Sequence, residues 1–138
     1  MVAGRVRRGS GAGLMRNGLY SIHVRLGDGR TGKGSGVAVC RDGSLLGGDA
    51  FLYYVGTYER RGDTVVGEVV VNQHSHSGAP VPIFGGRQVG IGFSGREIGG
   101  RFVLDGTAFA GRESMLFHAT LMFLADLPDE PTALPLAG

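Results

Sequence analysis

The sequence predicts an all-β protein, a small antiparallel up-and-down barrel of seven or eight strands. Apolar residues recur with a period of two, turn residues separate these runs at spacings of about ten residues, and no helical pattern is sustained. Glycine supplies 27 of the 138 residues, which suits strands that must bend around a narrow barrel. With 42% apolar residues, the chain can bury one modest core.

The first predicted strand covers residues 20–26, where Tyr20, Ile22, Val24 and Leu26 alternate with polar side chains. A glycine-rich lead then enters a second apolar run at residues 37–40. The same alternation returns five times, at residues 53–57, 65–71, 88–94, 101–105 and 114–123. Alternate side chains of a strand face opposite sides, so each apolar set is predicted to enter one core.

Turn residues separate these runs. Glycine with aspartate, serine or arginine marks predicted turns at residues 27–29, 41–44, 61–63, 94–96 and 105–106. Four glycines fall inside strand patterns, where we predict bulges or corners: Gly67, Gly90, Gly92 and Gly106. The longest connection, residues 72–86, holds two prolines and two histidines and is predicted to be a mobile loop or rim.

The predicted domain covers residues 17–125. Residues 1–16 contain four arginines and no acid, and they are predicted to be a disordered basic tail. Residues 126–138 contain three acids and three prolines and are predicted to be an acidic tail that leaves the domain. Met15 is a second candidate for the initiating methionine, because the stretch before it has no periodic apolar face.

The predicted domain itself is nearly neutral, which argues against nucleic-acid binding by the folded part, because such binding needs clustered cations. No apolar run reaches the roughly 18 residues of a membrane helix, and none after the N-terminal arginines is long enough for a secretory signal. One cysteine cannot form a disulfide framework. The chain is therefore expected to be cytoplasmic, with no membrane partner.

Four motifs that could carry chemistry are interpreted as structural. Residues 27–34 approach a phosphate-binding pattern but lead into a strand rather than a helix. His74 and His76 share one side of an extended chain without a third metal ligand nearby. Arg61-Gly62-Asp63 is interpreted as a turn, and Cys40 as a buried residue without a base. No catalytic residue, metal site or cofactor is predicted, and the chain is not expected to be an enzyme.

The predicted interior lacks charge, which leaves two possibilities open: a filled core or a pocket for one small apolar ligand. The candidate pocket residues are Tyr20, Ile22, Val39, Val69, Ile91, Phe93, Phe102, Leu104 and Phe117. Val37, Val65 and Leu121 are predicted to face the same interior. On the otherwise polar face of the final strand, Leu116, Met122 and Leu124 form a candidate homodimer patch.

Six segments together carry a family resemblance: residues 17–22, 34–39, 41–43, 46–49, 53–58 and 106–108. The most specific piece is Gly47-Gly48-Asp49, followed by the Tyr-Xaa-Gly strand Tyr54-Val55-Gly56. Over residues 17–124 the chain resembles the GrlR-like family, the negative regulators of type III secretion. The resemblance implies a lipocalin-like barrel, a homodimer, and a non-enzymatic regulator that sequesters a protein such as a transcriptional activator.

The turn at residues 59–63 departs from that family. The founding members carry a run of four acids at the place where this chain has Arg60-Arg61-Gly62-Asp63. We take Glu59, Arg60, Arg61 and Asp63 as a candidate partner-binding turn. We predict that it does not bind the founding members' activator, because reversed charge opposes the contact. The rival function is a carrier that holds a lipid or fatty acid in the barrel interior.

Overall fold

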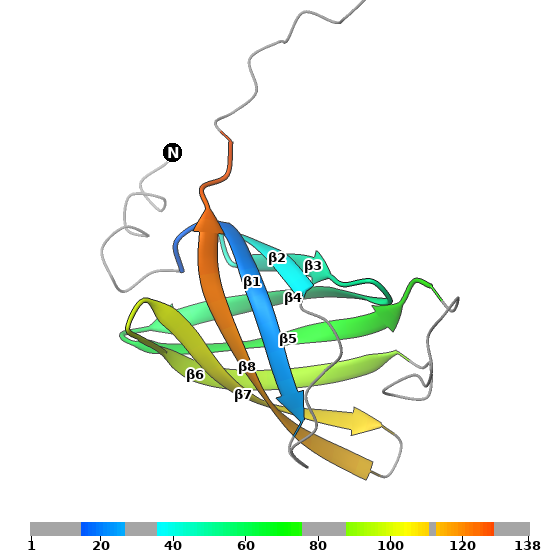
Figure 1. Cartoon of the computed structure of the whole chain (residues 1–138). Helices are drawn as coiled ribbons and strands as arrows, with labels where there is room; N and C mark the ends of the chain where they lie inside the picture. Colours follow the sequence, from blue (N-terminus) through cyan, green and yellow to red (C-terminus); the bar gives the residue numbers. More distant parts are fainter. Residues whose placement is uncertain (1–14, 27–35, 76–87, 111–112, 129–138) are drawn as a thin grey trace, which may run out of the picture.

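The computed structural model describes residues 15–26, 36–75, 88–110 and 113–128, and it is a closed barrel in which every strand is antiparallel to its neighbours (Figure 1). The strands are β1 Gly18–Leu26, β2 Gly36–Arg41, β3 Ser44–Gly48, β4 Leu52–Arg61, β5 Thr64–Gln73, β6 Val89–Ile98, β7 Arg101–Ala110 and β8 Glu113–Ala125. Each strand pairs with the next, and β8 pairs with β1. The predicted small, lipocalin-like up-and-down barrel is confirmed, with eight strands.

Alternation sorts the side chains between the inside and the outside of the barrel. In β8, Phe117, Ala119 and Leu121 are buried, whereas His118 between them is exposed. Among the described residues, none of the buried side chains is charged. The described interior is therefore packed mainly by apolar contact, as expected for strands with one dry face.

The structure corrects the predicted facing of β2. Val37 is 46% exposed and Val39 lies on the same outer face, whereas Ala38 and Cys40 are 1% and 0% exposed. Both valines were predicted to face the interior, and this prediction is wrong. Ala38 and Cys40 pack in one cluster with bulky aromatic side chains, including Tyr20, so only small side chains fit inward from β2.

Two predicted turns lie inside strands. Residues 94–96 belong to β6 and residues 105–106 to β7, and the hairpin between them turns at Gly99 and Gly100, with φ of 60° and 82°. Gly106 is not at a bulge either, because its pairing with Phe117 continues the register. A Cβ at Gly106 would lie 2.7 Å from the Phe117 ring, so this glycine makes room for an aromatic side chain. The sequence also gave no signal for β3, which has five residues, two of them glycine.

Two residues before the predicted boundary at residue 17 pack against the barrel, whose first strand begins at Gly18. Met15 is buried in the core, and Arg16 donates to Asp126 with Nη2 and Oδ1 2.7 Å apart. The Arg16 guanidinium also lies 4.1 Å from the centre of the Phe123 ring. Residues 15, 16 and 126 therefore pack at one end of the barrel. Residues 1–14 and 129–138 of the two predicted tails, and residues 76–86 of the predicted loop, lie outside the described residues.

An aromatic cluster fills this end of the barrel. The Tyr20 ring meets the rings of Phe102 and Phe123 edge to face, with centroids 6.1 Å and 5.6 Å apart. Its hydroxyl donates to the Arg16 carbonyl oxygen at 2.6 Å. Burial, together with the nearby Cys40 thiol, raises the pKa of Tyr20 to about 12. Burial likewise raises the pKa of Cys40 to about 12. This end is therefore closed by packed rings.

The stability of the fold is expected to fall as the pH rises above about 9, the ordinary pKa of a thiol in the unfolded chain. Between that value and about 12, the unfolded chain loses the Cys40 proton while the folded chain keeps it, so the free energy of unfolding decreases with pH. Urea unfolding at about pH 8 and about pH 10.5 measures the decrease. The Cys40→Ala variant should lose less stability over this interval than the wild type. An equal loss in both proteins would assign the decrease to other groups.

Candidate functional site

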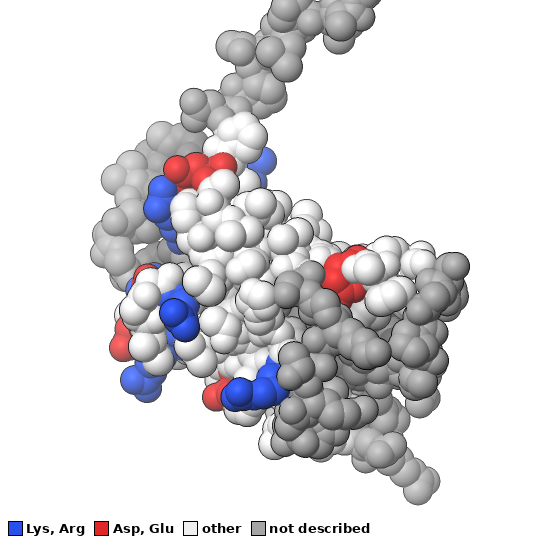
Figure 2. All heavy atoms as spheres, in the orientation of Figure 1, with Lys and Arg blue, Asp and Glu red and all other residues white. Residues whose placement is uncertain are grey.

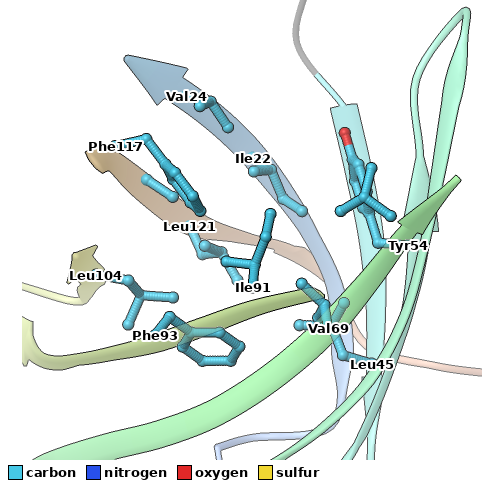
Figure 3. Close-up of a pocket in the computed structure, with 12 residues that line it drawn as sticks. Ile22, Val24, Leu45, Tyr54, Val69, Ile91, Phe93, Leu104, Phe117 and Leu121 are labelled. Carbon is cyan, nitrogen blue, oxygen red and sulfur yellow. The ribbon is translucent and has the colours of Figure 1, made fainter. Parts of the chain in front are cut away.

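An apolar cavity of about 90 Å³ lies inside the barrel and is partly open to the surface (Figure 3). Six predicted pocket residues line it: Ile22, Val69, Ile91, Phe93, Leu104 and Phe117. Six further residues complete the lining: Val24, Leu45, Tyr54, Val71, Ala119 and Leu121. The lining comes from every strand except β2. Three of these six further residues, Val24, Val71 and Ala119, stand two positions along their strands from residues that were predicted to face the interior. The sequence therefore contained a signal for them.

The other three predicted pocket residues lie elsewhere. Tyr20 and Phe102 belong to the aromatic cluster at the end of the barrel, and their rings fill space rather than line a cavity. Val39 lies on the outer face of β2. The interior therefore divides into a filled end and a hollow middle, and the candidate residues divide between them.

Tyr54 has the one polar side chain of the lining. Its hydroxyl donates to Oδ2 of Asp49 at 3.1 Å, and in Figure 3 it points away from Phe93. The other oxygen of Asp49 accepts hydrogen bonds from the backbone amides of Phe51 and Leu52, both at 2.8 Å. Burial first, and then the Asp49 charge, raises the pKa of Tyr54. The Gly-Gly-Asp block of the sequence thus holds the β3–β4 connection and fixes one wall of the cavity.

The candidate partner-binding turn joins β4 to β5, and its cations are paired. Arg60 donates to Oε1 of Glu97 at 2.9 Å, and the Arg60 side chain is only 19% exposed. Arg61 donates to Oε1 of Glu59 at 2.6 Å. Arg60 also donates to the Gly62 carbonyl oxygen, which ties its side chain to the turn. Both cations of the turn therefore face a carboxylate, and only Arg61, whose side chain is 75% exposed, presents its charge to the solvent. The predicted effect of this turn on partner choice stays a prediction.

Apolar side chains form a belt on the outside of the barrel. Leu19, Val39, Leu46, Val55 and Val70 are paired in register across β1 to β5, and they form one outward row. The row beside it contains Met122, Val37 and Tyr53, and Leu124 extends the belt on β8. We call these nine residues the apolar belt. The exposed fractions of seven of them are between 37% and 54%: Val37, Leu46, Tyr53, Val55, Val70, Met122 and Leu124.

No charged side chain interrupts the belt, because the remaining positions of its two rows are Ser21, Gly48 and Asn72. Figure 2 shows the face around β1 and β8, where uncharged residues form a broad area with charged groups toward its margins. The belt was not predicted from the sequence. The sequence does contain one sign of an apolar outer face, the run Val69-Val70-Val71, because alternation cannot turn all three valines inward.

A hollow of about 550 Å³ lies on the outer surface next to the β4–β5 part of the belt. Val55 and Val70 border it on one side, and Phe109, which is 66% exposed, borders it on the other. Gly90 and Gly92 form its floor, and a Cβ at either position would meet nothing within 4 Å. The glycines of β6 therefore leave an open depression, with apolar walls at Val55, Val70 and Phe109 and polar side chains at Thr57 and Glu68.

The three residues of the predicted dimer patch lie in two separate places on the outer surface. Leu116, Met122 and Leu124 all face outward and are exposed. Met122 and Leu124 join the apolar belt at β8. Leu116 lies six residues back along the strand, about 20 Å from Met122, and pairs with Thr107 of β7. A flat contact between two copies of the chain could therefore include Met122 and Leu124 without Leu116.

The described residues show no other site with evident chemistry. Within residues 15–26, 36–75, 88–110 and 113–128, no three side chains of His, Cys, Asp or Glu gather to hold a metal ion. Nε2 of His74 lies 2.9 Å from the Asp49 carbonyl oxygen. His76 and the whole phosphate-loop-like segment, residues 27–34, lie outside the described residues. In the same described part of the chain, no helix has the length and apolar character needed to cross a bilayer.

Comparison with known proteins does not assign the chain to a family. No family model matches the sequence, and no curated protein is similar to it. The resemblance to the GrlR-like family therefore stays a prediction. Arguments about function depend on the cavity and on the outer surface of the barrel.

Proposed function

We propose that this chain is a GrlR-like regulatory protein that acts by stoichiometric binding, with no chemical step. In this proposal it holds a protein partner, such as a transcriptional activator, against its outer surface. The observation that supports the proposal is the apolar belt with its adjoining hollow. Soluble proteins rarely expose contiguous apolar areas of more than a few hundred Å², and such areas mark interaction sites.

The shape of the belt indicates how partners would use it. Six neighbouring strands extend over about 24 Å at the usual strand spacing. Because the barrel is closed, a flat partner can contact only part of that arc at one time. We therefore assign the β3–β5 part, with Leu46, Val55 and Val70, to the regulated partner. We assign the β8 part, with Met122 and Leu124, to a second copy of the chain.

The hollow beside Val55 and Phe109 supports this assignment. An anchor residue in a partner, such as a large aliphatic or aromatic side chain, gains most from a concave apolar site whose walls are already formed. A typical stable interface buries roughly 800 Å² on each partner and has a polar rim around its apolar centre. The polar residues beside the belt, such as Thr57 and Glu68, would supply the polar rim.

Substituting Leu46 and Val55 with lysine is expected to abolish capture of the partner. Two desolvated cations in the middle of the contact oppose binding, and the two apolar contacts are lost as well. The measurement is affinity capture of the full chain from cells of its source, with quantitative mass spectrometry of stoichiometric partners. The wild type should retain a partner that the double variant loses by at least tenfold.

Two matched variants make this test specific. Thr64→Lys with Ser94→Lys adds the same charge on exposed positions outside the belt and should leave capture unchanged. Met122→Lys with Leu124→Lys should convert a dimer to a monomer in sedimentation while it keeps partner capture. Equal capture by the wild type and the Leu46, Val55 variant would place the interface elsewhere and overturn the assignment.

The carrier of a lipid or fatty acid is less well supported by the geometry. Ligand pockets for molecules of that size have volumes of about 300–1,000 Å³. The interior cavity has about 90 Å³, and none of the described residues that line it is cationic and could pair with a carboxylate. A fatty acid would require the barrel to widen and to bury its charged group without a partner.

A further inference from the structure

We propose that the interior cavity is a binding site for one small, uncharged, apolar molecule, held between Tyr54 and Phe117. The inference goes beyond the proposed regulatory function and rests on the inside of the barrel rather than on its outer belt. Figure 3 shows the side chains that converge on this space from opposite walls of the barrel.

The chemistry of the lining makes the cavity unsuitable for water. Buried water needs two to four polar partners. The Tyr54 hydroxyl already donates to Asp49, and every other lining side chain is aliphatic or a phenyl ring. A polar or charged ligand would lose its hydration here without a replacement. The site therefore selects molecules that have no hydrogen-bonding groups to satisfy.

The volume sets the size of the ligand. An apolar protein cavity of about 150 Å³ stays dry and holds benzene or xenon. The cavity in this barrel has about 90 Å³, which by proportion holds a molecule of about four non-hydrogen atoms. The class is thus a short hydrocarbon, a small haloalkane or a monatomic gas. Neither a fatty acid nor a sterol fits.

Close packing around the cavity supports a defined site rather than a loose core. The lining residues Val71 and Leu121 are both buried, and Gly106 is placed directly under the Phe117 ring. Because these walls cannot collapse, the atoms that line the cavity lack part of their dispersion contacts. A ligand of the right size supplies those contacts. The site would therefore bind by filling space.

Xenon is the probe that tests this inference. The wild type under a few bar of xenon should show saturable shifts of the methyl signals of Val69, Ile91 and Leu121 in carbon-13 NMR spectra. The methyl signals of the outer Val37, which borders neither the cavity nor the outer hollow, should not saturate. Xenon shifts that increase linearly and equally at inner and outer methyl groups would overturn the proposal.

A pair of variants localises the binding. Ala119→Leu adds three carbon atoms inside the cavity and should lower xenon affinity at least tenfold, whereas Thr120→Leu, on the outer face of the same strand, should leave it unchanged. If Ala119→Leu does not fold, a crystal of the wild type under xenon pressure should show a xenon atom between Tyr54 and Phe117, and a cavity without xenon refutes the site.

Two further experiments distinguish binding in the cavity from the fatty-acid carrier and from partner binding at the apolar belt. Decanoate, a charged chain of ten carbons, should not displace xenon; competition would favour the fatty-acid carrier and overturn the size argument. The Leu46→Lys, Val55→Lys variant should bind xenon as the wild type does. Failure of the belt proposal and failure of the cavity proposal are thus measured independently.

Discussion

The Phe117→Ala variant is expected to lose about 3–5 kcal/mol of the free energy of unfolding. Phe117 is 9% exposed and lines the interior cavity. Its ring lies against Gly106, which has no side chain that could fill the space left by the ring. Removing the ring both loses buried apolar surface and enlarges a cavity that already exists, because rigid strand walls cannot collapse into the space. Urea unfolding followed by circular dichroism measures the loss.

The neighbouring Leu116 provides the control for this variant. Its side chain is 63% exposed on the other face of the same strand, so Leu116→Ala should change stability by less than about 0.5 kcal/mol. The contrast depends only on which side of β8 each residue faces. A loss below about 1 kcal/mol for Phe117→Ala would contradict the packing of the ring inside the barrel.

The Gly95→Ala variant is expected to lose about 2–3 kcal/mol although it adds a single methyl group. An added Cβ would collide with the Val103 carbonyl oxygen and lie 2.7 Å from the Leu104 Cα. Both are backbone atoms of the paired strand β7, so no side-chain rotation relieves the clash. The strands must separate or twist, which strains the β6–β7 ladder. The urea midpoint measures this cost.

Gly92→Ala is the matched variant for Gly95. It makes the same change in the same strand, but on the outer face, where nothing lies within 4 Å of the added Cβ. Its stability should be unchanged or higher by up to about 1 kcal/mol, because alanine reduces the freedom of the unfolded chain. Equal losses for the two variants would show that the clash of the added Cβ with β7 is not the cause of the loss at Gly95.

Tyr53 and Tyr54 place a residue of the apolar belt next to a residue of the cavity lining. Tyr54 lines the cavity, and the adjacent Tyr53 belongs to the apolar belt on the outer face. Both residues follow the β3–β4 connection that Asp49 organises. One strand thus presents the inner and outer candidate sites at consecutive positions, which is a direct result of the alternation in β4.

The sequence by itself determined most strands and two of the turns. The alternation of Tyr20, Ile22 and Val24 located β1, since a period of two is a local property of the chain. The turns between β2 and β3 and between β4 and β5 follow the predicted Asp-Gly and Gly-Asp pairs, because turn chemistry is also local. The apolar interior, with six of the predicted residues around one cavity, follows from the same alternation.

Only the tertiary structure decided which face of β2 is buried, because both of its faces are apolar. Ala38 and Cys40 occupy the interior since the aromatic cluster leaves room there only for small side chains, and Val37 and Val39 are placed on the belt as a consequence. The belt itself depends on the register of neighbouring strands, which no single segment encodes. The size of the cavity likewise depends on how side chains from seven strands fill one volume, so it is a property of the closed barrel rather than of any strand.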